Sequence, residues 1–167
     1  TIRYEDGHRG HQLTRDPMGR PVLRPCSDGS WARYRFDPAG RMIKAENEVR
    51  RIGFAYDPRG LVLRERQDGV EIAHAMSLRG ERLATILPDG RRISYGYDQD
   101  GQFDQLSFQG REVLELTRDR MGRETLREGG TIGLQTEYDP EGRVERQRAY
   151  RQRRDAPVFG RSYSYDQ

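Results

Sequence analysis

Two histidines and one cysteine are the side chains of this sequence that come nearest to a metal or nucleophilic site. His8 and His11 have a ligand-like spacing, but we identify no third ligand nearby. Cys26 is the only cysteine, which excludes an intrachain disulfide, and the histidines are distant from it in sequence. A small side chain near a turn is the simpler interpretation of Cys26. The sequence therefore predicts no catalytic residue, no metal site and no cofactor site.

Aspartates recur along the chain and could be mistaken for paired general acids. Each is followed three residues later by a glycine, and these glycines lie 20 or 21 residues apart. A period of this size marks a repeat architecture, so we interpret each aspartate as the cap of its own turn. The predicted repeat anchors are Asp16 and Gly19; Asp37 and Gly40; Tyr56, Asp57 and Gly60; Gly80 in a degenerate copy that begins at Ser77; Tyr97, Asp98 and Gly101; Asp119 and Gly122; and Tyr138, Asp139 and Gly142.

The residue types of the anchor predict a type I β-turn. An aspartate at the first position can accept a hydrogen bond from the backbone N–H two residues later, and proline at the second position presets φ. Glycine at the fourth position tolerates a positive φ as the chain leaves the turn. A turn of this kind commonly closes a hairpin, so each anchor is predicted to join two strands.

The residues around each anchor predict the strands themselves. Positions one, three and five before the aspartate are mainly aromatic or aliphatic, as in Tyr97, Tyr95 and Ile93, and the positions between them are mostly polar. This alternation indicates a strand with one apolar face. A second turn is expected at the other end of each hairpin, at Asp28-Gly29, Asp68-Gly69, Asp89-Gly90, Gln109-Gly110 and Gly129-Gly130, and Asp-Gly is the preferred dipeptide of a type I′ turn. The predicted fold class is all-β, an antiparallel meander of repeated hairpins.

Aromatic residues at matching offsets predict a ladder of rings. We expect these rings to line one face and to contact their counterparts in neighbouring repeats. Tyr95 and Tyr97 should then share a face, with Ser94 on the opposite one. The predicted ladder comprises Tyr34, Phe36, Phe54, Tyr56, Tyr95, Tyr97 and Tyr138.

Two segments interrupt the rhythm. Residues 44–50 lack an Asp-Gly pair and could form a helical turn, but we favour a turn built on Asn47. The step from Asp139 to Asp166 is 27 residues, so the last hairpin is longer than the others and carries an arginine-rich loop at 148–157. We favour a solvated connection for this loop, and the alternative is a docking site for an acidic partner.

Composition limits the remaining possibilities. Hydrophobic residues make up 33% and charged residues 34%, with a mean hydropathy of −1.04, so a single-layer sheet fits better than a thick closed core. The 30 basic residues face 27 acids, a mixed-sign surface that argues against nucleic-acid binding. No run approaches the ~18 apolar residues of a membrane span, and no signal peptide opens the chain. Because it begins within a strand pattern and ends at a truncated anchor, we expect residues 1–167 to be one repeat segment of a longer protein.

The unit Tyr-x-Tyr-Asp-x-x-Gly-Arg, plain at Tyr95–Asp98 and repeated along the whole chain, resembles the YD repeat of the Rhs family of bacterial polymorphic toxins. It is similar also to the shell components of tripartite insecticidal toxin complexes and, more distantly, to the teneurins. The resemblance implies a curved sheet that is part of a larger spiral shell around a C-terminal toxic domain. Family members end the shell with a self-cleaving motif that contains Asp-Pro-x-Gly-Leu. Residues 57–61 match that phrase once, but ordinary repeats flank them, so no protease function is transferred.

The function expected from this resemblance is structural. The segment would help to encapsulate and deliver a C-terminal toxic domain in interbacterial competition or toxin secretion, and it would not be an enzyme. Its expected partners are the rest of its own shell and the enclosed toxin domain, with the spike or chaperone proteins of a secretion system as further candidates; its expected location is outside the bacterium that exports it. The alternative is a repeat-built surface for cell adhesion or ligand binding, as the likeness to teneurins would allow.

Overall fold

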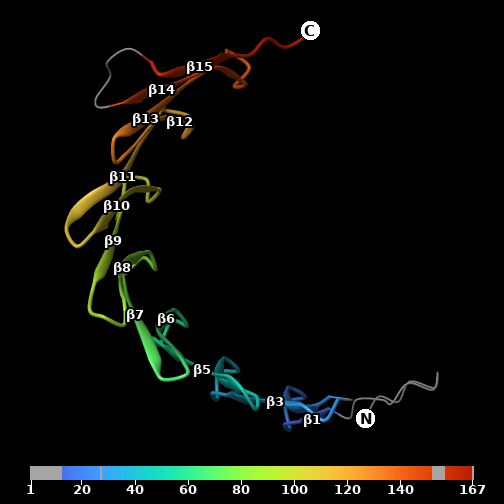
Figure 1. The fold of residues 1–167 in the computed structure, drawn as a ribbon. Helices are drawn as coiled ribbons and strands as arrows, with labels where there is room; N and C mark the ends of the chain where they lie inside the picture. Colours follow the sequence, from blue (N-terminus) through green and yellow to red (C-terminus); the bar gives the residue numbers. More distant parts are fainter. Residues whose placement is uncertain (1–12, 27, 152–156, 167) are drawn as a thin grey trace. The chain divides into compact units, whose positions relative to one another are not determined.

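The computed structural model describes residues 13–26, 28–151 and 157–166, and within these residues the chain forms fifteen β-strands and no helix (Figure 1). No helix that could cross a membrane is found in this part of the chain. The strands are β1 (Thr14–Arg15), β2 (Pro21–Pro25), β3 (Trp31–Phe36), β4 (Met42–Glu46), β5 (Arg51–Tyr56), β6 (Val62–Gln67), β7 (Val70–Met76), β8 (Arg82–Ile86), β9 (Arg92–Tyr97), β10 (Phe103–Phe108), β11 (Arg111–Arg118), β12 (Glu124–Gly129), β13 (Ile132–Tyr138), β14 (Val144–Arg151) and β15 (Phe159–Ser162).

The chain divides into two compact units. The first comprises Thr1–Gly80 with Ile86–Gly90, and the second comprises Glu81–Thr85 with Arg91–Gln167. In the first unit, β1 to β7 pair in sequence order, and every pair is antiparallel. In the second unit, β9 to β15 pair in the same way. The predicted all-β antiparallel meander is confirmed.

Cross-strand register separates two faces of the first unit's sheet. Tyr34 lies opposite Ala45, and Ala45 lies opposite Ile52, so these residues share what we call the aromatic face. Arg35 and Lys44 lie opposite each other one position along, on what we call the polar face. Alternate side chains of a strand project to opposite sides, which is why one sequence pattern produces both faces.

Burial is shallow, as the composition predicted. Ala84 is the only fully buried apolar residue in the described part of the chain, and most other apolar side chains are half-buried. Among the described residues of the first unit, no second layer of secondary structure covers the aromatic face. Backbone ladders and cross-strand side-chain contacts must therefore supply most of the stability of the sheet, at roughly 0.2–1 kcal/mol per side-chain pair.

The turns opposite the anchors are of three kinds. Asp68 has φ 51° and Gly69 has φ 93°, and Gln109 and Gly110 have φ 52° and 76°. Positive φ at both central residues is the type I′ pattern, so the prediction is confirmed at these two sites.

The prediction of type I′ turns is wrong at two other Asp-Gly pairs. The Gly29 N–H donates to the Cys26 carbonyl at 3.2 Å, and the Gly90 N–H donates to the Leu87 carbonyl at 2.9 Å. In each turn the glycine has a positive φ and the aspartate before it does not. An aspartate pays a steric cost at positive φ, and a longer loop places it at the third position of the turn, where φ is negative.

The Gly129-Gly130 prediction is also wrong, because the turn lies one residue later. Gly129 pairs with Ile132 at the end of the ladder, so Gly130 and Thr131 form the two-residue loop. Gly130 has φ 59°, whereas the φ of Thr131 is not positive. Positive φ at the first central residue alone is the type II′ pattern.

The two breaks in the rhythm have different outcomes. Residues 47–50 form the expected turn on Asn47, whose N–H donates to the Arg50 carbonyl and whose Oδ1 accepts the N–H groups of Val49 and Arg50. The arginine-rich loop is only partly described, because residues 152–156, with Arg153 and Arg154, lie outside the described residues. Within its described part, Arg148 pairs with Glu137 at 3.1 Å.

Candidate functional site: a clasp between successive repeats

Each anchor that begins with aspartate is a compact turn closed by two backbone hydrogen bonds. The Gly60 N–H donates to the Asp57 carbonyl at 3.0 Å, and the Asp57 N–H donates to the Leu61 carbonyl at 2.9 Å. Gly60 has φ 93°, a region that side chains with a Cβ rarely adopt. The same positive φ occurs at Gly19, Gly40, Gly80, Gly101, Gly122 and Gly142.

The aspartate side chain caps its own turn. Asp57 is buried, with 8% of its surface exposed, and its Oδ1 accepts the N–H groups of Arg59 and Leu61 at 2.9 Å. In the degenerate copy, Ser77 replaces the aspartate, and its hydroxyl oxygen accepts the N–H of Arg79 at 3.1 Å. The same double acceptance occurs at Asp16, Asp98 and Asp119. These carboxylates are therefore committed to backbone donors.

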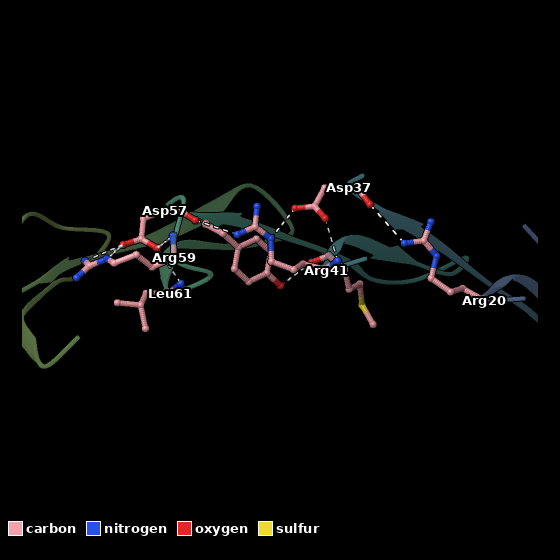
Figure 2. Close-up of polar contacts among 8 residues, drawn as sticks. Arg20, Asp37, Arg41, Asp57, Arg59 and Leu61 are labelled. Atoms are coloured by element: carbon pink, nitrogen blue, oxygen red, sulfur yellow. Dashed lines mark hydrogen bonds and ion pairs between the residues drawn. The ribbon is translucent and has the colours of Figure 1, made fainter. Parts of the chain in front are cut away.

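The arginine that follows the anchor glycine links one repeat to the next. Arg41 Nε donates to Asp37 Oδ2 of its own turn at 2.6 Å, and its Nη1 donates to the Asp57 carbonyl of the next turn at 2.9 Å (Figure 2). Its guanidinium carbon lies 4.9 Å from the centroid of the Tyr56 ring. A cation over a ring at this distance contributes roughly 0.5–1 kcal/mol at an exposed site.

The tyrosine that precedes the next aspartate reaches back to the repeat before it. The Tyr56 hydroxyl donates to the Met42 carbonyl at 2.6 Å, and Met42 is the second residue after Gly40. At the same offset, Tyr97 donates to Arg82, Tyr138 to Glu124 and Tyr165 to Val144, at 3.0, 2.8 and 2.9 Å. The hydroxyl explains why tyrosine serves this position better than phenylalanine.

We call this reciprocal pair the clasp: the residue after one anchor glycine together with the residue before the next anchor aspartate. One member reaches forward and the other reaches back, so neighbouring repeats are joined by side chains as well as by the backbone ladder. The arginine carbon lies 4.5–4.9 Å from the ring centroid in the pairs Arg20–Phe36, Arg41–Tyr56, Arg123–Tyr138 and Arg143–Tyr165.

Three clasps lack the arginine, because Leu61, Glu81 and Gln102 follow their anchor glycines. After Gly80, the backward hydrogen bond of Tyr97 remains, and the clasps after Gly101 and Gly60 use other residues.

Arg118 stands where tyrosine is expected, and its Nη2 donates to the Phe103 carbonyl at 2.7 Å. In the repeats that carry this tyrosine, its hydroxyl donates to the carbonyl at this position. Its Nη1 lies 3.9 Å from Asp98 Oδ2. Asp98 is the anchor whose own glycine is followed by Gln102 instead of arginine. The cation has moved to the other member of the pair.

The clasp after Gly60 is rearranged in another way. Leu61 takes the arginine position and lies against Gly80 of the next anchor, where an added Cβ would be 3.6 Å from Leu61 Cδ1. Arg59, two residues earlier, supplies the cation. Its Nε donates to Asp57 Oδ2 at 2.8 Å (Figure 2), and its Nη1 donates to the Ser77 carbonyl at 2.9 Å. The repeat-to-repeat contact is thus preserved from a different sequence position.

The predicted ladder of stacked rings is wrong in one respect. Tyr95 and Tyr97 do share a face, because both rings contact Phe103, at centroid distances of 6.3 and 6.2 Å. Phe54 and Tyr56 are 6.4 Å apart within one strand. In the described residues, however, no ring contacts its counterpart in the next repeat. Arginine guanidinium groups lie between the rings of successive repeats instead. Successive anchors are separated by two strands, and an arginine side chain is long enough to span that distance, whereas a ring is not.

Clasp electrostatics lower the pKa values of the anchor carboxylates. The backbone N–H of Arg41, followed by its guanidinium, holds the pKa of Asp37 below the ordinary 3.8. At Asp119, burial alone would raise the pKa, but the backbone and side-chain hydrogen bonds of Arg123 outweigh it, so the net pKa is also lowered. The clasp therefore favours the ionised carboxylate.

The remaining candidates from the sequence form no recognisable site. His8 and His11 lie outside the described residues. Cys26 is half-buried, and its N–H donates to the Ser30 carbonyl at 2.7 Å. Among the residues that the structure describes, no group of three or more histidine, cysteine, aspartate or glutamate side chains could hold a metal ion.

Sequence reasoning recognised the aspartates, glycines and aromatic residues but missed the role of the arginines. Their signal was visible, because Arg20, Arg41, Arg123 and Arg143 all follow an anchor glycine directly. A second omission is His74, whose side chain is 3% exposed and whose Nε2 lies 3.1 Å from Glu65 Oε1. It occupies an aromatic position of the pattern and carried no signal of its own.

Comparison with known proteins identifies the fold. No protein-family model matches this chain, and no curated protein matches it. Solved structures do match: a TcdB2-TccC3 crystal structure at TM-score 0.60, the same pair with Cdc42 at 0.58, and a Tc holotoxin pore of Photorhabdus luminescens at 0.59. Each is 15% identical and covers 93% of this chain, and this chain spans only 11% of each solved chain. The likeness establishes an Rhs-like fold.

Proposed function

We propose that this chain is a wall segment of an Rhs-type shell that encloses a C-terminal toxic domain and helps to deliver it. The observation that carries the proposal is the clasp. Because a guanidinium, a tyrosine hydroxyl or both connect each described repeat to the next, a wall can be extended one repeat at a time without a thick core. The fold shared with the Tc toxin chains supports the same interpretation.

The role proposed for this segment is structural and not catalytic. Its anchor carboxylates accept hydrogen bonds from backbone N–H groups and arginines. Stabilisation of the turns therefore accounts for the recurrence of these aspartates. The partners that follow are the remaining repeats of the same shell and the toxin domain inside it, with spike or chaperone proteins of a secretion system at its exterior. The protein would be exported from a bacterium.

Protection of the enclosed domain tests this function. The complete open reading frame that contains this segment should yield a hollow particle by electron microscopy, and its C-terminal domain should survive a protease that degrades the same domain expressed alone. A double variant, Arg41→Met with Arg123→Met, removes two clasp cations and should open that domain to cleavage. Arg120→Gln, at an exposed turn position, is the matched control.

An extended particle whose C-terminal region is cleaved at the same rate in every variant would overturn the shell proposal. If that particle also carried a membrane anchor and extracellular modules, the adhesion alternative would take its place.

A further inference from the structure

A hollow lies on the polar face of the first unit, above Gly53 in the middle of β5. Its volume is about 430 Å³, and its lining includes four basic residues, Arg35, Lys44, Arg51 and Arg66, and one acid, Asp68. Neither the clasp nor the proposed shell function accounts for this hollow. It lies away from the anchors and extends from β3–β6 to the Asp68-Gly69 turn.

Cross-strand register places three of these cations in one row. Arg35 on β3 is opposite Lys44 on β4, Lys44 is opposite Gly53 on β5, and Gly53 is opposite Arg66 on β6. We call Arg35, Lys44, Gly53 and Arg66 the cationic row. Neighbouring strands are about 4.8 Å apart, so Lys44 and Arg66 flank a gap of roughly 10 Å that no side chain fills.

The cations of the row are poorly compensated. Like charges directly opposite each other in a ladder are destabilising, and Arg35 faces Lys44 in this way. Both arginines of the row are exposed, and neither Arg35 nor Arg66 forms an ion pair in the described part of the chain. Lys44 shares Glu46 with Arg51, at 2.7 and 3.2 Å.

The nearby acids are engaged elsewhere. Asp68 accepts a hydrogen bond from Arg50 Nη1 at 2.8 Å. Glu71 lies opposite Arg66 in the register, yet its ion pair is with Arg64 at 3.9 Å. The row therefore presents more positive charge than its surroundings neutralise.

Gly53 keeps the hollow open without being required by the fold. Its φ is not positive, and an added Cβ would meet only the Ile43 carbonyl oxygen at 3.7 Å and Arg66 Cβ at 4.0 Å, which are ordinary contacts. Glycine in the interior of a strand weakens it, and it often marks a place where a ligand approaches the backbone closely. A residue with a side chain would fit here but would fill the space between the cations.

We propose that the cationic row binds an acidic polypeptide segment, with a carboxylate seated over Gly53 between Lys44 and Arg66. Guanidinium groups bind carboxylates in a planar, two-pronged geometry, so Arg66 and Arg35 supply direction as well as charge. Glu46 and Glu71 border the row and would repel the continuous phosphates of a nucleic acid, whereas separate carboxylates on a peptide can avoid them. This inference does not depend on the shell function.

Binding of a model peptide to the full chain tests the site. The probe is a fluorescein-labelled hexaglutamate peptide, with hexaglutamine as its neutral counterpart, and the measurement is fluorescence anisotropy at low and at physiological salt. Hexaglutamate should bind, hexaglutamine should not, and added salt should weaken the binding. Arg66→Gln and Arg35→Gln should each raise the Kd by about threefold or more, and the double variant should raise it further.

Gly53→Ala and two matched controls make the test specific. Gly53→Ala should raise the Kd because its methyl group enters the hollow. Gly133→Ala places a methyl group on another strand glycine whose nearest neighbours would be 3.7 and 3.8 Å away, and it should leave the Kd unchanged. Arg120→Gln removes the same charge from an exposed turn of the second unit and should also have no effect.

Three outcomes would overturn the proposal. The first is an Arg120→Gln effect as large as that of Arg66→Gln, which would mean attraction by net charge alone. The second is inorganic phosphate that displaces the peptide at equal concentration, which would make the row a phosphate site. The third is an unchanged Kd in the double variant with its β-sheet circular dichroism intact. Because both arginines are exposed, these variants are expected to fold, so the result is informative even if Gly53→Ala does not.

Discussion

Arg118 Nη2 donates to the Phe103 carbonyl at 2.7 Å and thereby replaces the tyrosine hydroxyl that serves the equivalent carbonyl in other repeats. The replacement is paired with a second change, because the anchor before it carries Gln102 instead of arginine. Arg118 also lies 3.9 Å from Asp98, the carboxylate that has lost its usual cation. This repeat looks degenerate in sequence, but it still forms a clasp. The positive charge is on Arg118, before the second anchor, instead of on the residue after the first anchor glycine.

Removing the Arg118 donor should destabilise the protein more than exchanging it. Arg118→Leu leaves the Phe103 carbonyl without a side-chain donor, so we expect the free energy of unfolding in urea to fall by ~1–3 kcal/mol. Arg118→Tyr should cost less because its hydroxyl can reach the same carbonyl. In combination with Gln102→Arg it rebuilds the common clasp, and a double-mutant cycle should show a favourable coupling of at least ~0.5 kcal/mol. Equal losses for leucine and tyrosine would contradict the exchange.

The tyrosine hydroxyl of the clasp can be tested by removing one atom. Tyr56→Phe keeps the ring under Arg41 but removes the hydrogen bond to the Met42 carbonyl. The free energy of unfolding should therefore fall by ~0.5–1.5 kcal/mol. Tyr34→Phe is the control, because the Tyr34 hydroxyl has no hydrogen bond to any described residue. A similar shift of the urea midpoint in both variants would show that the hydroxyl is not part of the clasp.

The shared face of Tyr95 and Tyr97 predicts similar effects of truncation. Tyr97→Ala should cost ~1–3 kcal/mol through lost burial and loss of the ring contact with Phe103, and Tyr95→Ala should behave alike. Ser94→Ala, on the opposite face, should change stability little. Thermal unfolding of the three variants measures this, and a Ser94→Ala loss as large as the tyrosine losses would refute the assignment of faces.

Substitution of an anchor glycine by alanine should destabilise the protein more than the same substitution of a strand glycine. Gly60→Ala forces a Cβ into φ 93° and should cost ~1 kcal/mol or more. Gly142→Ala should cost at least as much, because its Cβ would also lie 3.3 Å from Arg123 Nη1. Gly53→Ala, at a φ that is not positive, is the comparison. If the three melting temperatures fall equally, the turn conformation does not determine the cost.

Stability should decline in acid as the anchor carboxylates are protonated. The pKa values of Asp37, Asp57, Asp119 and Asp139 are lowered in the folded state, so their contribution is complete above the unfolded value of 3.8 and is lost as the pH falls through the lower folded values. Urea unfolding between pH 7 and pH 2.5 should show the loss beginning near pH 4. Asp37→Asn should make the acid loss smaller and Glu145→Gln should not; an unchanged profile for Asp37→Asn would exclude the clasp as its cause.

The sequence by itself determined the period, the all-β meander, the turn at Asn47 and the shared face of Tyr95 and Tyr97. Turn chemistry and period-two alternation act within a few residues, so they can be recognised without knowing what lies across the sheet. The same local reasoning failed for the turns at Asp28-Gly29 and Asp89-Gly90. Loop length decides which turn position an aspartate takes, and loop length depends on where the strands stop pairing.

Only the tertiary structure decided which repeats hold one another and how. The clasp joins residues that are well separated in sequence, such as Arg41 and Tyr56, 15 positions apart, and two strands must be correctly paired before they meet. The cationic row likewise exists only because the register places Lys44, Gly53 and Arg66 side by side. A one-residue slip would send those side chains to the other face, so the register, which no single repeat encodes, creates both sites.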